Sequence, residues 1–295
     1  PHIKKIIVAN NVYVAAWNSF IYDNKYELIP VDADINTWNF DLSKISQHID
    51  NRTCILATHN IGNIINVPKL QEEFPDTPII EDNCEGFLGS YRGCQSGSES
   101  FASAVSFFAN KTITSGEGGL FVTKDKDIFE YINSVKNQGQ SNTRYLHNHL
   151  GYNYRMTNLQ AALLTGQLES RQEILHKKKE IFEAYFKHLT HPKIFFQSTQ
   201  ADTTHSNWML GVRFSGFNEE KRKRLQFHLQ QNGIDTREMF YPIGCHKHLK
   251  DMQGEQCNAS VLRAECLVLP SYPDLRGSQV ELISENILSF VNNES

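Results

Sequence analysis

Residues 79–119 constrain the fold of this chain more than any other stretch. The run 79–82 begins apolar and ends acidic, which is typical of a buried strand whose last residue is Asp82. A second apolar run surrounds Ser106, and Lys111 and a glycine-rich turn follow it. Because open α/β sheets bind ligands beyond the carboxyl ends of their strands, we expect Asp82 and Lys111 to face one crevice.

A lysine amine and a carboxylate in one crevice are the groups that pyridoxal 5'-phosphate (PLP) requires. The amine bonds to the cofactor, and the acid holds the nitrogen of its ring. Each residue alone has an ordinary explanation, since strand-end carboxylates often cap helices and most lysines are solvated. The hypothesis of a PLP site depends on the pair and on its flanking glycines, Gly116, Gly118 and Gly119.

Other short apolar runs alternate with helical patterns and predict an α/β sheet covered on both faces. A helix is expected to open at Asp41, and a capping box at Thr157 starts a helical pattern that reaches about Leu189. A straight helix of that length would span roughly 50 Å, too long for a compact domain. We therefore expect a bend near Gly166.

The chain of 295 residues is long enough for a large domain and a smaller one. We predict a large α/β domain over residues 1–165 with a mostly parallel sheet. A long connecting helix would follow over residues 166–190, and a small C-terminal α+β domain over residues 191–295. The strand pattern from Trp208 to Phe214 and the helix ended by Gly233 belong to the last of these.

Composition limits the partners and the compartment. The formal net charge is −4, which gives no basic surface for nucleic acid, and no apolar run has the length of a membrane span. The six cysteines form no CxxC pair, so we expect reduced thiols and a cytoplasmic location. The clusters around His147 and Cys245 lack a second ligand pair at zinc spacing, and no metal is expected.

Several blocks, taken in order, resemble the DegT/StrS family of PLP-dependent nucleotide-sugar aminotransferases. They are ANNVYVAAWN, IPVDADINTWNFD, IIEDNCEGFLGSY, VSFFANKTITSGEGGLFVT, GYNYRMTNLQAALLTGQLE and GIDTREMFYPI. The resemblance covers nearly the whole chain and is strongest to the perosamine- and viosamine-synthase branch. It implies the fold-type-I PLP-dependent aminotransferase fold, with PLP as cofactor.

The resemblance also implies roles for the first group of site residues. Lys111 would bond to PLP and move the proton at the sugar carbon, and Asp82 would pair with the pyridine nitrogen. Ser106 would hydrogen-bond the cofactor phosphate. Tyr13 would stack on the ring, and Glu85 would lie near the ring hydroxyl. Without the resemblance, Tyr13 is equally well explained as a core aromatic and Ser106 as a buried hydroxyl.

A second group of residues concerns the partner chain and the substrate. Asn153 would reach the phosphate of PLP in a neighbouring subunit, which implies a homodimer with shared active sites. Arg155 and Arg237 are weaker candidates for binding the diphosphate of a sugar nucleotide, since surface arginines are common. The implied reaction moves an amino group, with glutamate as the donor, to C4 of an NDP-4-keto-6-deoxyhexose. The nucleotide stays open among dTDP, UDP and GDP.

Three alternatives remain beside this reading. The chain could be a PLP-binding regulator or an inactive homologue, or a sugar C3 aminotransferase of the same family. A dehydratase branch has histidine where this chain has Lys111, and the lysine argues against that reaction. The family's N-terminal part, with a Gly-Thr-Ala-Ala-Leu turn that grips the phosphate, has no counterpart here. We therefore expect the sequence to be the later part of a longer protein.

Overall fold

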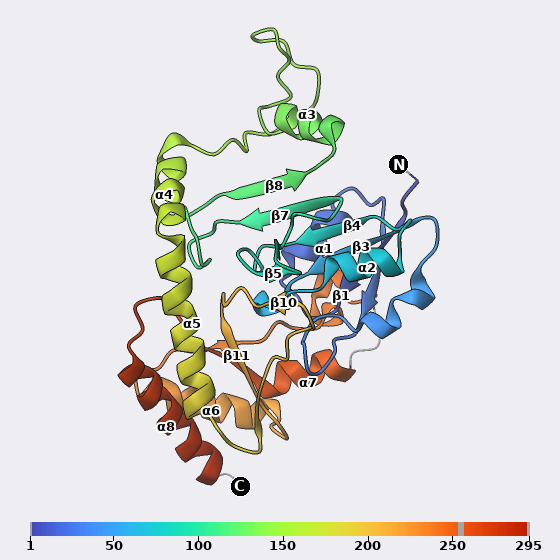
Figure 1. Ribbon diagram of the computed structural model, residues 1–295. Helices are drawn as coiled ribbons and strands as arrows, with labels where there is room; N and C mark the ends of the chain where they lie inside the picture. Colours follow the sequence, from blue (N-terminus) through green and yellow to red (C-terminus); the bar gives the residue numbers. More distant parts are fainter. Residues whose placement is uncertain (1, 253–256, 294–295) are drawn as a thin grey trace.

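The computed structural model describes residues 2–252 and 257–293 (Figure 1). Within them, the largest sheet has the strand order β2-β1-β3-β4-β7-β8. All neighbouring pairs in this sheet are parallel except β7 and β8, which are antiparallel. The strands are β1 (Lys5–Ala9), β2 (Glu27–Val31), β3 (Thr53–Thr58), β4 (Ile79–Asp82), β7 (Ala102–Ser106) and β8 (Gly119–Thr123). The prediction of a mostly parallel sheet is confirmed.

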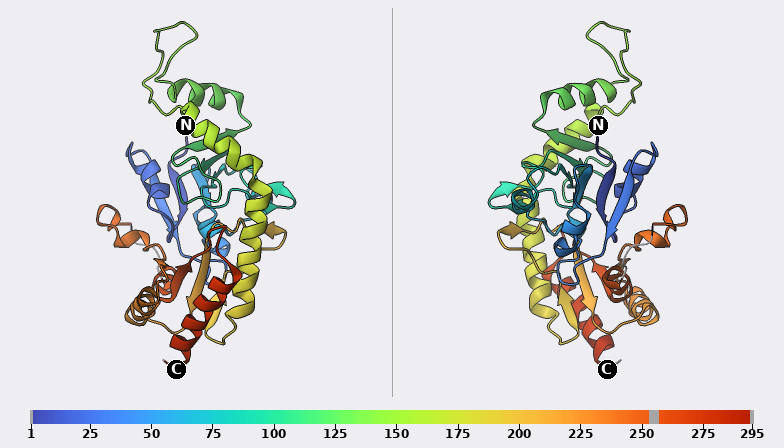
Figure 2. Two further views of the ribbon diagram at one scale, coloured as in Figure 1. Left: turned by 90° about the vertical axis from the view of Figure 1, so that its left-hand side faces the viewer. Right: turned by 90° about the vertical axis from the view of Figure 1, so that its right-hand side faces the viewer.

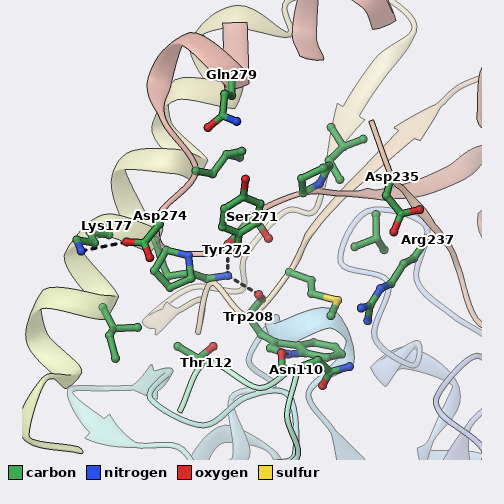
Figure 3. Close-up of a pocket in the computed structure, with 18 of the residues that line it drawn as sticks. Asn110, Thr112, Lys177, Trp208, Asp235, Arg237, Ser271, Tyr272, Asp274 and Gln279 are labelled. Atoms are coloured by element: carbon green, nitrogen blue, oxygen red, sulfur yellow. Dashed lines mark hydrogen bonds and ion pairs between the residues drawn. The ribbon is translucent and has the colours of Figure 1, made fainter. Parts of the chain in front are cut away.

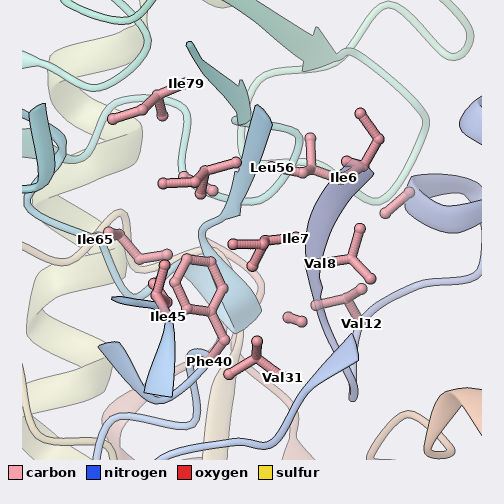
Figure 4. Close-up of a cluster of buried hydrophobic side chains, with 14 of the residues drawn as sticks. Ile6, Ile7, Val8, Val12, Val31, Phe40, Ile45, Leu56, Ile65 and Ile79 are labelled. Carbon is pink, nitrogen blue, oxygen red and sulfur yellow. The ribbon is translucent and has the colours of Figure 1, made fainter. Parts of the chain in front are cut away.

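The core of this sheet explains why its strands are nearly continuous apolar runs. Every residue of β3 is buried, as expected of a central parallel strand that is covered on both faces. Side chains from β1, β3 and β4 meet Phe40 and Ile45 in one cluster, in which Ile7 and Ile55 are fully buried (Figure 4). Helices α1 (Ala15–Ile21) and α2 (Val67–Glu73) follow β1 and β3 along the chain.

A second, antiparallel sheet forms the C-terminal part, with the strand order β12-β13-β11-β9. Its strands are β9 (Ile194–Phe196), β11 (Leu210–Phe214), β12 (Arg237–Glu238) and β13 (Cys266–Leu269). The helices are α6 (Glu219–Gln231), α7 (Cys257–Glu265) and α8 (Gly277–Asn293). A third sheet contains only short strands, namely β5 (Ser90–Tyr91), β6 (Cys94–Gln95) and β10 (Thr203–Thr204).

The predicted long helix is present as two helices, α4 (Asn158–Glu169) and α5 (Arg171–His188). They form one column that runs from the large sheet to the C-terminal part (Figures 1 and 2). Thr157 and Gln160 form the predicted capping box. The expected bend near Gly166 is wrong in position, because α4 continues through Gly166 and the helical geometry breaks at Ser170.

The helix predicted from Asp41 is also corrected. Two 3-10 turns, Leu42–Lys44 and Ser46–His48, occupy the segment. The Asp41 carboxylate accepts hydrogen bonds from the amide and the hydroxyl of Ser43. This local cap starts a tight turn as well as it starts an α-helix, which is why the sequence pattern did not separate the two.

The two main sheets are joined by a buried contact between Trp38 and β11. Trp38 packs with Trp208, Met239 and other apolar side chains of the C-terminal part. A Cβ atom at Gly211 would lie 2.2 Å from the Trp38 ring, so only glycine permits this approach. The contact fixes the crevice between the two parts.

A projecting segment, residues 119–169, contains β8, α3 (Lys126–Val135), the loop after it, and α4. Asp125 caps α3, but neither α3 nor α4 has a buried residue. Leu159 is 80% exposed and Leu150 is 92% exposed. Figure 1 shows α3 and its following loop standing away from the sheets. Across the described part of the chain, no helix combines the length and apolar character that crossing a membrane requires.

Candidate functional site

The carboxyl ends of two paired strands carry the first site residues. Asp82 is the last residue of β4, and Ser106 is the last residue of β7, which pairs in parallel with β4. Lys111 lies in the loop that follows β7. The loop closes on itself, since the Lys111 amide donates to the Phe108 carbonyl (2.9 Å). The predicted meeting of Asp82 and Lys111 at one sheet edge follows from this topology.

Glu85 is buried beside these two residues. Its carboxylate accepts a hydrogen bond from the Ile61 amide (2.7 Å). Burial raises the pKa of Glu85 to about 7, the positive charge of Lys111 opposes the rise, and the charge of Asp82 adds to it. Ile61 has a φ of 57°, a strained conformation for a β-branched residue, so the hydrogen bond to Glu85 holds an unfavourable backbone in place.

A buried network supports β4 just before Asp82. Glu81 accepts hydrogen bonds from His59 Nε2 (2.8 Å), the Tyr91 hydroxyl (3.1 Å) and the Gly97 amide (2.8 Å). His59 Nδ1 accepts from the Ile65 amide, which places the ring proton on Nε2. Burial alone would raise the pKa of Glu81. The hydrogen bonds that the carboxylate accepts, above all the one from His59, outweigh burial and keep the pKa below its ordinary value.

Lys111 faces the indole ring of Trp208. Its Nζ atom lies 4.0 Å from the ring centroid, and Trp208 Nε1 donates to the carbonyl of Asn110 (2.9 Å). Lys178, on α5, donates from Nζ to the carbonyls of Trp208 (2.6 Å) and Ser271 (2.5 Å) (Figure 3). Burial lowers the pKa of Lys178 to about 7.

Lys111 and Trp208 line a pocket of about 850 Å³ between the large sheet and the C-terminal part. That volume falls in the range typical of small-molecule sites. Polar side chains from both parts reach it, with Arg237 and Asp235 on one side and Lys177 and Asp274 on another (Figure 3). Lys177 and Asp274 form an ion pair (3.3 Å) at the pocket wall.

The structure brings together some of the predicted site residues and leaves others apart. Arg237 lines the pocket with Lys111, whereas Asp82, Glu85 and Ser106 are not among the residues that line it. Tyr13 follows β1 and is 60% exposed, with its ring 6.0 Å from that of Phe240. Asn153 and Arg155 lie in the projecting segment, where Arg155 donates to Asn137 (3.4 Å), and neither lines the pocket.

Two residues of the site were missed by the sequence reasoning. Trp208 was interpreted only as an apolar strand position. Lys178 carried a usable signal, because it lies at helical spacing from Ile181, Phe182 and Tyr185, which are buried on the same face of α5. A lysine in that phase is buried with the apolar residues, and its ammonium group must find a partner.

The residues fit PLP by their chemistry. The set contains an amine for the cofactor aldehyde and a carboxylate for the pyridine nitrogen. Ser106 Oγ accepts from the Phe108 amide (3.3 Å), so its own proton is available to a phosphate oxygen. Among the residues that the structure describes, no three His, Cys, Asp or Glu side chains gather as a metal site. All six cysteines fall within the described ranges and are free thiols.

Comparison with known proteins places the chain in a family. Residues 2–288 match the model of the DegT/DnrJ/EryC1/StrS aminotransferase family. The GDP-perosamine synthase of Escherichia coli O157:H7 is 33% identical over 294 residues, which are 98% of this chain and 80% of that protein. A dTDP-3-amino-3,6-dideoxy-alpha-D-galactopyranose transaminase of Aneurinibacillus thermoaerophilus is 28% identical and covers 96% of this chain and 78% of its own length.

A solved structure supports the same fold. The putative sugar aminotransferase Spr1654 of Streptococcus pneumoniae, in its PMP form, superposes with a TM-score of 0.90 at 20% identity. The match covers 98% of this chain and 82% of that one. The fold-type-I architecture expected from the sequence is thereby confirmed. The chain belongs to the DegT/DnrJ/EryC1/StrS aminotransferase family and is a PLP-dependent sugar aminotransferase.

Proposed function

We propose that the chain transfers an amino group from glutamate to C4 of an NDP-4-keto-6-deoxyhexose, giving a 4-amino-4,6-dideoxy sugar nucleotide of the perosamine or viosamine type. The observation that carries this proposal is the pocket in which Lys111 and Arg237 face the same space. The 33% identity to a GDP-perosamine synthase favours C4 as the position of transfer. We place the reaction in the cytoplasm.

The chain's own residues divide the work of holding the cofactor. PLP, when bound, supplies the electron sink and carries the amino group between the two substrates. Asp82 would hold the ring nitrogen in its protonated form, and Ser106 would donate its hydroxyl proton to the phosphate. Glu85 would face the ring hydroxyl, where a carboxyl with a pKa of about 7 can act as donor or acceptor.

Lys111 would bond to the cofactor at rest and move the proton at C4 of the sugar when it is released. Its place on the loop after β7 puts Lys111 among the residues that line the pocket. A proton delivered from one fixed side determines the configuration at C4. Arg237, which lines the same pocket, would bind the diphosphate, because a guanidinium can donate two hydrogen bonds to one phosphate group.

The proposed homodimer would complete each site with residues that one chain does not bring to the pocket. Asn153 of the partner subunit would contact the cofactor phosphate, and Arg155 of the partner subunit would contact the sugar nucleotide. Exposed apolar side chains such as Leu159 and Leu163 on α4 support an interface in this region. Tyr13 would stack on the cofactor ring from its exposed position after β1.

A C3 aminotransferase is the second candidate, favoured by the 28% identity to the dTDP-3-amino sugar transaminase. The PLP-binding regulator has weaker support, a 25% identity over 88% of this chain to a protein of Geobacillus stearothermophilus named pleiotropic regulatory protein. Purified protein with PLP and glutamate is tested on dTDP-, UDP- and GDP-linked 4-keto-6-deoxy sugars and on their 3-keto isomers, with mass spectrometry and NMR of the product. An amino group at C4 supports the proposal. An amino group at C3, or none with any sugar, overturns it.

The variant Lys111→Ala is expected to lose the reaction completely, because Lys177 and Lys178, which line the same pocket, lie on α5 and not on the loop after β7. Lys124→Ala is the matched control, since Lys124 is an exposed lysine whose ion pair with Glu99 lies on the surface. Arg237→Ala is expected to raise KM for the sugar nucleotide about 10- to 100-fold, as loss of a charge-assisted phosphate contact does. An unchanged KM would remove Arg237 from the substrate site.

A further inference from the structure

Two hydrogen bonds hold Trp208, one at its indole ring and one at its backbone carbonyl. Neither of them has a role in the proposed reaction. Its indole Nε1 donates to the carbonyl of Asn110, the residue before Lys111, and its own carbonyl accepts from Lys178 Nζ (2.9 and 2.6 Å). The side chain is only 6% exposed and belongs to the cluster that joins the two main sheets. The ring therefore has little freedom to move.

The face of this ring is occupied by the Lys111 side chain. With Nζ 4.0 Å from the ring centroid, the geometry is that of a cation–π contact with tryptophan, the aromatic residue that makes the strongest ones. Lys111 is half-buried, and water competes less with such a contact there than at the surface. The contact thus places the Lys111 amine against the face of the Trp208 ring.

Lys178 ties together three segments around this contact. It projects from α5 and bonds the carbonyl of Trp208, before β11, and the carbonyl of Ser271, after β13 (Figure 3). It is 4% exposed, and burial lowers its pKa to about 7. Charged or neutral, a lysine amine keeps at least two N–H groups, so both hydrogen bonds persist on either side of that pH.

We propose that Trp208 is a positioning residue that holds the Lys111 amine whenever it is not bonded to the cofactor, and that Lys178 fixes Trp208 in that position. The proposal rests on the proposed role of Lys111. In each turnover that amine leaves the cofactor and must come back to the same atom. A fixed resting place on Trp208 keeps it within reach and prevents it from turning into the open pocket.

The direct test is NMR of the full chain, free of cofactor, with lysine labelled at Cε. An indole face shifts nearby protons upfield, so the ε-CH₂ protons of Lys111, assigned with Lys111→Arg, are expected upfield of the other lysines. Trp208→Leu should abolish the shift, and Trp208→Phe, which keeps an aromatic face, should retain part of it. An ordinary position in the wild type, or an unchanged shift in Trp208→Leu, overturns the proposal.

The role of Lys178 is tested with Lys178→Met, which keeps the length of the side chain but leaves two carbonyls without their donor. The Lys111 signal is expected to move toward the ordinary lysine position, and attachment of added PLP to Lys111 is expected to slow about tenfold. Lys179→Met is the control, because Lys179 is the next residue on α5 and its side chain is 68% exposed. An unmoved Lys111 signal in Lys178→Met overturns this half of the proposal.

The outcome also separates this inference from the proposed function. A Lys111 signal that is upfield in the wild type but does not respond to PLP would contradict the role of Lys111 and leave the contact with Trp208 intact. A Lys111 signal that responds to PLP but is not upfield in the wild type would contradict the contact with Trp208 and leave the role of Lys111 intact. If Trp208→Leu fails to fold, Trp208→Phe and the wild-type spectrum still decide the question.

Discussion

The interior of the large sheet and the projecting segment 119–169 bury their apolar side chains very differently. Every residue of β3 is buried, whereas α3 and α4 have no buried residue at all. The sheet is stable through its own apolar contacts. The helices of the projecting segment have good caps at Asp125 and Thr157, but their apolar side chains are left uncovered by the rest of the described chain. Local signals therefore suffice to form a helix there and do not show what covers it.

The candidate site shows the same contrast between residues held by the large sheet and residues of the projecting segment. Asp82, Ser106 and Glu85 are held by the large sheet and by the buried network around Glu81. Asn153 and Arg155 belong to the projecting segment, whose helices have no buried residue. One half of the proposed site is therefore built into the large sheet, and the other half would come from the proposed second subunit.

The largest difference in the free energy of unfolding is expected between two alanine variants, one that removes a buried partner of a glutamate and one that removes an exposed partner. His59→Ala removes a hydrogen bond to the buried Glu81 carboxylate and opens a cavity, and should lower the free energy of unfolding by about 3–5 kcal/mol. Lys124→Ala breaks the surface pair with Glu99 and should change the free energy of unfolding far less, because water screens an exposed ion pair. Denaturant unfolding measures both. Equal losses would contradict the contrast.

Glu85 gives the next largest effect, and it depends on pH. Its folded pKa of about 7 lies above the ordinary value of 4.5, so the folded state holds the extra proton between these values and stability falls as pH rises through them. Relative to Glu85→Gln, the cofactor-free wild type should lose about 2–3 kcal/mol of unfolding free energy between pH 5 and pH 8.

The control for this pH effect is Glu130→Gln on α3 of the projecting segment, where the carboxylate is exposed and pairs with Lys126. Its stability difference from the wild type should be nearly flat over the same range. A flat difference for Glu85→Gln as well would show that Glu85 is not held in the buried state.

The smallest effect on stability is expected for two variants that each shorten an apolar side chain by one carbon. Ile55→Val in the sheet interior should cost about 0.5–1.5 kcal/mol, and Leu159→Val on α4 should change the monomer by less than about 0.5 kcal/mol. If the proposed dimer covers α4, the effect of Leu159→Val should appear as weaker dimerisation in sedimentation experiments. A protein that stays monomeric at all concentrations would contradict the shared-site proposal.

Much of the fold was predictable because its signals are local. Apolar runs identified the strands, and the pair of Asp82 and Lys111 followed from the rule that parallel strands present ligands at their carboxyl ends. The break at Ser170 was misplaced at Gly166, because glycine in a helix costs little when the neighbouring turns are well formed.

The missed part of the site depends on contacts distant in sequence. Trp208 meets Lys111 only because β11 and the loop after β7 converge in space, and Lys178 meets Ser271 only because α5 lies against the end of β13. No periodicity encodes such a meeting. The burial phase of Lys178 on α5 indicated that it needed a partner, but not which one.

The central claim is that Lys111 bonds to PLP at rest and is released when the cofactor takes up the amino group of glutamate, and one measurement tests it most directly. Purified protein is incubated with PLP, reduced with borohydride, digested and analysed by mass spectrometry, with and without prior treatment with glutamate. The account predicts the cofactor mass on the peptide that contains Lys111, strongly reduced after glutamate. Cofactor on a different lysine, or on Lys111 but insensitive to glutamate, would contradict it.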